Sequence, residues 1–213
     1  EKYMGKFPVV SVTLKNVDAG NYETARGMLC SVVGNEALRF RFLLESSRLS
    51  DDEKAQYRQL VKLDMTGRQG FVMPDEVLAG SLLTLSKLLW KHYGQKTILL
   101  IDEYDVPLDK AQQYGYYDQM AGLIRNLFGQ ALKSNHSLHF AVLTGCLKVA
   151  KESIFTGLNN LNTFSVADPG FSRCFGFTDG EVRALLESYG LEGHYGTVRE
   201  WYDGYRFGSR ALY

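Results

Sequence analysis

Two adjacent acidic residues, Asp102 and Glu103, follow a short apolar run near the middle of the chain. Residues 98–101 read Ile-Leu-Leu-Ile, without a polar interruption. Such a run is typical of a strand that is buried on both faces of a parallel sheet. This strand would hold Asp102 rigidly at the sheet edge, where its carboxylate could bind Mg²⁺ beside nucleotide phosphates. Glu103 could then orient or deprotonate an attacking water.

A polar residue also follows a second apolar run. Residues 138–143 are mostly apolar, and Thr144 and Gly145 come directly after them. At a strand end, Thr144 could contact a γ-phosphate or the attacking water. A strand, a helix of about 18 residues and a second strand form a right-handed crossover, which would place Asp102 and Thr144 at the same sheet edge. Each feature alone has a plainer explanation, because parallel strands often end in acidic loops and Thr is common in turns.

Three longer motifs occur in order along the chain. Residues 98–108 read ILLIDEYDVPL, residues 141–160 read AVLTGCLKVAKESIFTGLNN, and residues 201–208 read WYDGYRFG. The first contains the Walker B pattern of P-loop ATPases, and the three together resemble the bacterial AAA-ATPase-like family. Its members are described as predicted ATPases, so the resemblance implies ATP as substrate and Mg²⁺ as metal. It also implies a C-terminal nuclease-like domain of the PD-(D/E)XK type in the full-length protein.

The phosphate-binding loop of such ATPases is expected before the first strand, yet residues 1–213 contain no GxxxxGK[ST] segment. Gly5 and Lys6 are followed by Phe7 and do not fit this pattern. The chain also lacks an initiator Met, so we expect a fragment whose phosphate loop lies upstream of Glu1. Backbone N–H groups of that loop supply most phosphate contacts. We therefore expect the fragment alone to bind ATP weakly and to be inactive.

Basic residues after the second strand end are candidates for contacts with phosphate. Lys148 is assigned to the nucleotide-binding side, although Lys148 and Lys151 could equally form a solvated helix face. Arg206 lies among aromatic residues, where an arginine-finger role competes with packing of its stem on the rings. Asp105 and Asp109 are interpreted as loop and helix-start residues rather than metal ligands.

The composition favours a globular domain and gives no sign of nucleic-acid or membrane binding. Lys+Arg and Asp+Glu both number 24, and 45% of the residues are hydrophobic. The balanced charge gives no overall field that would attract nucleic acid or a membrane surface, and no apolar run approaches the ~20 residues that span a bilayer. Cys30, Cys146 and Cys174 show no metal-binding spacing and fit a reducing cytoplasm.

The remaining pattern predicts the elements that hold these residues. Strands are predicted at residues 8–14, 97–102 and 138–144, with a weaker one at 164–166, and helices at about 22–44, 50–63, 74–94, 116–133, 147–151, 178–190 and 195–202. This alternation indicates an α/β fold with a P-loop NTPase-like parallel sheet at residues 1–170, truncated before its first strand and phosphate loop. A small helical annex is expected at residues 171–213. The three main strands should be parallel neighbours. Residues 138–144 should then form an exposed apolar edge, or the strand at residues 164–166 should fill the place of the missing first strand.

The leading hypothesis is ATP binding and hydrolysis, coupled to conformational change in an attached effector domain. A second is a regulatory or scaffolding module that uses nucleotide as a switch with little turnover. The weakest is a metal-dependent nuclease built on Asp102, Glu103 and Asp105, because no downstream strand supplies the partner acid and lysine. The expected partners are ATP, the nuclease-like domain and further copies of the chain, in the bacterial cytoplasm and without direct nucleic-acid or membrane binding.

Overall fold

The structure is a computed structural model that describes residues 2–64, 70–146, 154–155, 161–165, 168, 170, 176–202, 204–207 and 210–212. The chain divides into two compact units, Glu1–Asn159 and Asn160–Tyr213. Among the described residues, no helix combines the length and the apolar character that crossing a membrane requires.

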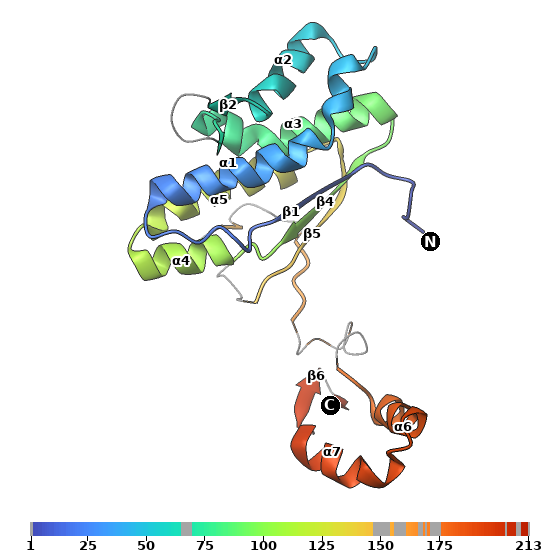
Figure 1. The fold of residues 1–213 in the computed structure, drawn as a ribbon. Coiled ribbons are helices and arrows are strands. Elements are labelled where there is room, and N and C mark those ends of the chain that lie inside the picture. The colour runs from blue at the N-terminus through green and yellow to red at the C-terminus, as the bar shows by residue number, and fades with distance from the viewer. Residues whose placement is uncertain are drawn as a thin grey trace. The chain divides into compact units, whose positions relative to one another are not determined.

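The core of the first unit is a sheet of three parallel strands (Figure 1). In sheet order they are β1 (Val9–Thr13), β4 (Thr97–Asp102) and β5 (Leu138–Leu143). The register pairs Thr13 with Asp102 in one ladder and Ile101 with Leu143 in the other, so the three carboxyl ends share one edge. The predicted strand order and direction are therefore confirmed.

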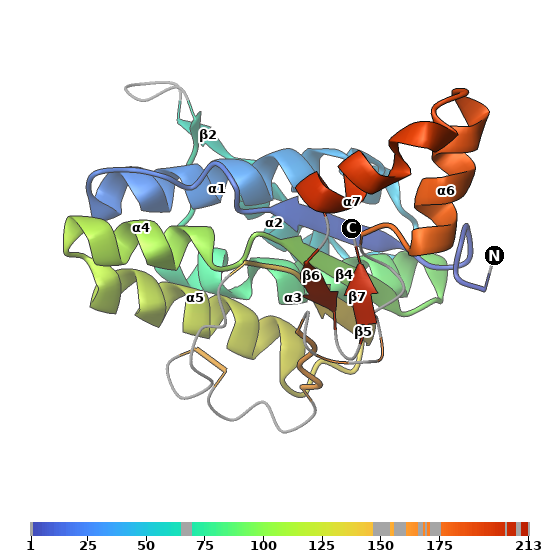
Figure 2. The ribbon, with the colours of Figure 1, turned by 90° about the horizontal axis from the view of Figure 1, so that it is seen from below.

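Helices of the first unit cover one face of this sheet. They are α1 (Tyr22–Leu38), the short 3₁₀ helix η1 (Arg41–Glu45), α2 (Asp51–Leu60), α3 (Asp75–Tyr93), α4 (Val106–Tyr114) and α5 (Tyr117–Leu132). The connections from β1 to β4 and from β4 to β5 step in the same direction, so right-handed crossovers place α1, α3 and α5 on the same side. Figure 1 shows these helices on one side of the sheet, and Figure 2 shows the sheet from the other.

The two faces of the sheet differ in exposure as this arrangement requires. On the helix side, Val10, Leu99 and Ile101 are at most 2% exposed. On the other side, Leu100 is 37% exposed and Val142 45%. Within the described residues β5 pairs only with β4, so it forms the expected edge strand with an exposed apolar side chain.

Local sequence signals set several helix ends. Ser50 and Glu53 form a reciprocal capping box at the start of α2, which satisfies two backbone N–H groups that would otherwise lack partners. Gly94 ends α3 with a φ of 72°, a conformation that glycine adopts without a Cβ clash. Both ends agree with the sequence-based expectation.

The end of α1 differs from the expectation, because the helix stops at Leu38 rather than near residue 44. The buried hydroxyl of Tyr57 in α2 donates a 2.6 Å hydrogen bond to the carbonyl oxygen of Ala37. The backbone N–H of Phe40 uses the same carbonyl at 2.9 Å, in the tighter pattern of a helix end. Burial raises the pKa of Tyr57 to about 12, since the apolar surroundings favour the neutral phenol.

Other elements were not predicted or were predicted wrongly. Helix α4 occupies a segment expected to be a loop, and two short hairpins were missed: β2 (Leu63–Asp64) with β3 (Gly70–Phe71), and β6 (Tyr205–Phe207) with β7 (Arg210–Leu212). Phe164 and Ser165 do not form the weak strand expected at residues 164–166, and Val166 lies outside the described residues. Ser165 instead forms a local turn, because its backbone N–H and hydroxyl both donate to the carboxylate of Asp168. The helix expected at residues 147–151 also lies outside the described residues.

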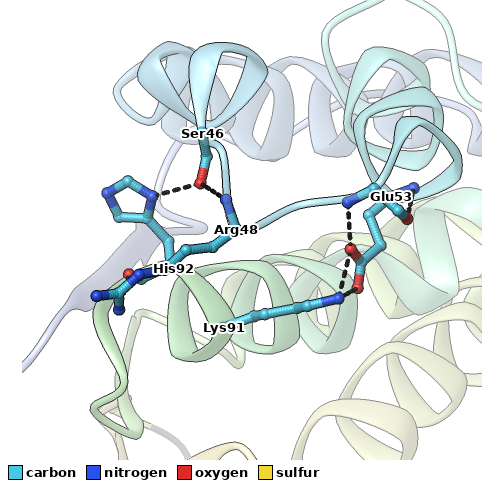
Figure 3. A network of polar contacts seen from close by, with 6 residues as sticks. Ser46, Arg48, Glu53, Lys91 and His92 are labelled. Carbon is cyan, nitrogen blue, oxygen red and sulfur yellow. Dashed lines mark hydrogen bonds and ion pairs between the residues drawn. The ribbon is translucent and has the colours of Figure 1, made fainter.

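A polar network fixes the α2 region against the end of α3 (Figure 3). Lys91 forms a 2.8 Å ion pair with Glu53, the carboxylate that also caps α2. One residue on, His92 contacts the Ser46 hydroxyl at 2.8 Å through Nδ1, and its carbonyl accepts a 2.9 Å hydrogen bond from Arg48. This end of α3 leads directly into β4, so the network braces the amino end of the strand that carries Asp102.

Gly34 marks a close approach between α1 and the β2–β3 hairpin. A Cβ atom there would lie 2.7 Å from Cδ2 of Phe71 and closer still to two other ring carbons. We expect Gly34→Ala to lower the free energy of unfolding by roughly 1–3 kcal/mol, the usual cost of overpacking. Gly27, in the same helix, has no atom within 4 Å of such a Cβ.

Gly27→Ala is therefore the matched control, and we expect it to raise the free energy of unfolding by roughly 0.5–1 kcal/mol through helix propensity. Urea unfolding, followed by circular dichroism, measures both variants. Equal midpoints for the two variants would contradict the close contact between Gly34 and Phe71.

The second unit contains a small helical part. It consists of α6 (Asp179–Ser188), the 3₁₀ helix η3 (Glu192–His194) and α7 (Tyr195–Tyr202), followed by the antiparallel pair β6–β7. Thr178 and Glu181 form the predicted capping box. Tyr195, at the start of α7, contacts α6, because its hydroxyl donates a hydrogen bond to Asp179 and the guanidinium carbon of Arg183 lies 3.7 Å from its ring centre.

Candidate functional site

Backbone hydrogen bonds hold the carboxyl ends of the three strands together. Beyond β1, the N–H of Leu14 donates to the carbonyl of Asp102 at 2.9 Å. Beyond β5, the N–H of Thr144 donates to Ile101 at 2.9 Å, and the carbonyl of Thr144 accepts from Tyr104 at 3.1 Å. Pairing therefore continues past the regular strands, which fixes the backbone on both sides of Glu103.

Asp102 and Thr144 lie side by side at this edge. Both are exposed to solvent, and the Thr144 hydroxyl donates a short hydrogen bond to Oδ1 of Asp102. A carboxylate oriented in this way keeps lone pairs for a cation, and a hydroxyl that donates to a metal-binding carboxylate helps to orient it. The geometry brings together the two residues that the strand pattern predicted to be neighbours.

The side chains that the structure places together at this edge are one carboxylate, that of Asp102, and one hydroxyl, that of Thr144. Among the described residues, no group of three or more His, Cys, Asp or Glu side chains could hold a metal ion. Mg²⁺ is commonly bound by one or two carboxylates, with waters and substrate phosphates completing its octahedron. Asp102 could supply one such carboxylate.

Glu103 adopts an unusual backbone conformation. Its φ is 55°, in the left-handed region that non-glycine residues seldom occupy. Its carbonyl accepts a 3.2 Å hydrogen bond from Val106, which closes the turn into α4. Such conformations cost free energy and cluster at functional sites. Glu103 is half-buried in this turn.

Asp105 is buried against the residue that follows Thr144. Its exposed fraction is 2%, and it occupies the N-cap position of α4 without capping the helix through its side chain. A Cβ on Gly145 would lie 2.9 Å from Cγ of Asp105 and 2.9 Å from Cε1 of Tyr104. The sequence indicated only that Asp105 and Asp109 were loop and helix-start residues, and it contained no signal for the contact of Asp105 with Gly145.

Phe155 packs against aromatic residues of the β4–α4 turn and of α5. Ile154 and Phe155 are 2% and 8% exposed. The ring of Phe155 packs edge-on against Tyr104 at 5.4 Å between centroids, and it stacks at 6.3 Å with Phe128 of α5. Phe155 thus packs against the β4–α4 turn that also carries Glu103.

Three basic sequence candidates, Lys148, Lys151 and Arg206, are not assigned to this edge. Lys148 and Lys151 lie outside the described residues, so their expected approach to phosphate stays a prediction. Arg206 belongs to β6 of the second unit. Its expected roles, an arginine finger or packing on aromatic rings, also stay predictions.

An open hollow of about 400 Å³ lies on the helical layer, lined by residues at the N-terminal ends of α1 and α3 and along α5. Its lining includes the carboxylates of Asp75, Glu76 and Asp118. Three carboxylates would repel nucleotide phosphates. The hollow therefore does not compete with the sheet edge as a site for nucleotide.

A comparison with known protein families identifies a family for the first unit of the chain. The profile of a family described as predicted AAA-ATPase matches residues 1–155. The chain belongs to this AAA-ATPase-like family. The matched region contains all three strands of the sheet and both Asp102 and Thr144.

A relative of this AAA-ATPase-like chain gives no further information on activity. A protein of Azotobacter chroococcum mcd 1, named as an uncharacterized protein in the vnfD 5′ region, is 36% identical over 123 residues. The match covers 56% of this chain and 23% of that relative, so the matched segment spans less than a quarter of the relative's length. No solved structure matches the chain.

Proposed function

We propose that this AAA-ATPase-like chain supplies the magnesium-binding and water-activating side of an ATP-hydrolysing site. The observation that carries the proposal is the hydrogen bond from Thr144 to Asp102 at the carboxyl edge of parallel strands. Ligands of open α/β sheets bind at this edge. Glu103 follows Asp102 directly in the chain, at the start of the turn into α4.

Each residue of the site has a proposed role. Asp102 binds the magnesium ion, Thr144 orients Asp102 and faces the γ-phosphate, and Lys148 contributes positive charge to the nucleotide side. Mg²⁺, when bound, neutralises charge on the phosphate oxygens. Glu103 accepts a proton from the attacking water as the water oxygen bonds to the γ-phosphorus. The bond from that phosphorus to the bridging oxygen then breaks, which releases ADP and phosphate.

The phosphate cradle is proposed to come from a segment of the full-length protein outside residues 1–213. No glycine-rich phosphate loop occurs within residues 1–213, and such loops provide most contacts to phosphate through backbone N–H groups. We further propose an ATPase core at residues 1–170, an annex at 171–213, and coupling to an attached nuclease-like effector domain or to further copies of the chain. The cytoplasm is the proposed location.

The test is phosphate release by the full-length protein, with Mg²⁺ and with EDTA, and with and without nucleic acid. We expect release that requires Mg²⁺, and tighter ATP binding by the full-length protein than by residues 1–213 alone in titration calorimetry. Magnesium-dependent ATP binding without phosphate release would replace hydrolysis by a nucleotide switch. Nucleic-acid cleavage that is independent of ATP and abolished by Asp102→Ala would overturn the proposal in favour of a nuclease.

A further inference from the structure

Asp105 is placed where it can control the position of Thr144. It lies three residues after Asp102 in the chain, and its carboxylate is buried over the backbone of Gly145, directly after Thr144. Tyr104, its neighbour, donates to the carbonyl of Thr144 at 3.1 Å and has its ring edge over the same glycine. Two consecutive residues of the β4–α4 turn, Tyr104 and Asp105, therefore contact the backbone that follows β5.

Gly145 is needed here for space. A Cβ atom would overlap the Asp105 carboxylate and approach the Tyr104 ring, at separations that Cβ atoms essentially never show. Other contacts hold both Asp105 and Tyr104 in place. Asp105 begins α4, its carbonyl accepts hydrogen bonds from Leu108 and Asp109, and the Tyr104 ring packs on the buried Phe155.

We propose that Asp105 and Gly145 form a size-matched contact that positions Thr144 against Asp102 and Glu103. Asp105 is a positioning residue, because it is buried against Gly145 and influences Thr144 through the backbone that joins these two residues. The inference rests on the proposed ATPase function for its catalytic consequence. Its structural part, the dependence of the β5 end on this contact, can be measured without that function.

The experiment uses the full-length protein with Gly145→Ala, Asp105→Ala, the two combined, and Asp105→Asn. Gly129→Ala is the control, because a Cβ on that glycine of α5 meets no atom within 4 Å. Two quantities are compared: hydrogen exchange of the backbone amides of Tyr104 and Thr144, and kcat and KM for ATP. Thermal unfolding identifies any variant that does not fold.

We expect Gly145→Ala to speed exchange at both amides and to lower kcat by about 10- to 100-fold with little change in KM, as small misplacements of catalytic groups do. The combined variant should regain most of the exchange protection and at least fivefold of the kcat, because removal of the carboxylate makes room for the methyl group. Asp105→Asn has nearly the same shape and should stay close to the wild type. Gly129→Ala should match the wild type in both measurements.

Independent effects of the two substitutions on amide exchange would overturn the size-matched contact. Coupled exchange with an unchanged kcat in Gly145→Ala would overturn the positioning role while the proposed ATPase stands. If the wild type releases no phosphate, the proposed function fails, and coupled exchange would then support the contact alone. If Gly145→Ala does not fold, Asp105→Ala and Asp105→Asn decide the matter: equal exchange in these two variants would overturn the inference.

Discussion

Glu103→Gln in the full-length protein is expected to leave ATP binding nearly unchanged and to lower the rate of phosphate release by about 10²- to 10⁴-fold, the usual contribution of a general base. The amide preserves the size of the side chain, but it cannot accept the proton of the attacking water. Glu103 is half-buried at the turn after β4 and lies next to Asp102 in the chain. Because the substitution leaves the carboxylate of Asp102 unchanged, it should affect the chemical step and not the proposed magnesium ligand.

Single-turnover phosphate release and titration calorimetry measure the rate and the affinity separately. Asp109→Asn provides a matched acid-to-amide control, because Asp109 lies in the first turn of α4 and accepts a hydrogen bond from Gln113. We expect this control to hydrolyse ATP at the wild-type rate. Wild-type hydrolysis by Glu103→Gln would remove Glu103 from the mechanism.

Asp102→Ala has a different expected signature, which is loss of the dependence of ATP binding on Mg²⁺. Removal of a partner that merely orients a metal ligand typically costs about 10- to 100-fold in metal affinity, so loss of the ligand itself should cost at least as much. Thr144 has this proposed role, and its hydroxyl donates a hydrogen bond to Asp102. Thr144→Val, which keeps the shape and removes the donor, should give a smaller loss in the same direction.

The measurement is ATP affinity as a function of Mg²⁺ concentration in the full-length protein. Thr144→Ser is the control, because it retains the hydroxyl that reaches Asp102. We expect an affinity order of wild type and Thr144→Ser first, Thr144→Val next and Asp102→Ala last when Mg²⁺ is present, with convergence in EDTA. An Asp102→Ala variant whose affinity responds to Mg²⁺ as the wild type does would show that the ion is held elsewhere.

The elements of the sheet edge could be predicted from the sequence alone. The unbroken apolar run before Asp102 predicts a buried strand, and the alternation of strands with helices then indicates parallel neighbours with a shared carboxyl edge. The capping box at Ser50 and the glycine at position 94 fix helix ends for equally local reasons. In all these cases the interacting groups lie within a few residues of one another, or the arrangement follows from the order of strands and helices, so a single sequence suffices.

Contacts between residues far apart in the chain emerged only when the layers packed. Helix α1 ends where the hydroxyl of Tyr57 takes a carbonyl at Ala37, 20 positions earlier. Gly34 accommodates a ring from the β2–β3 hairpin, and Gly145 accommodates the carboxylate of Asp105, 40 positions earlier. In one sequence, a glycine required by a distant side chain looks the same as a glycine in an ordinary turn. Whether a side chain larger than glycine can be accommodated depends on which surfaces meet in the folded protein. Because interiors are closely packed, this steric restriction exists only once the chain has folded.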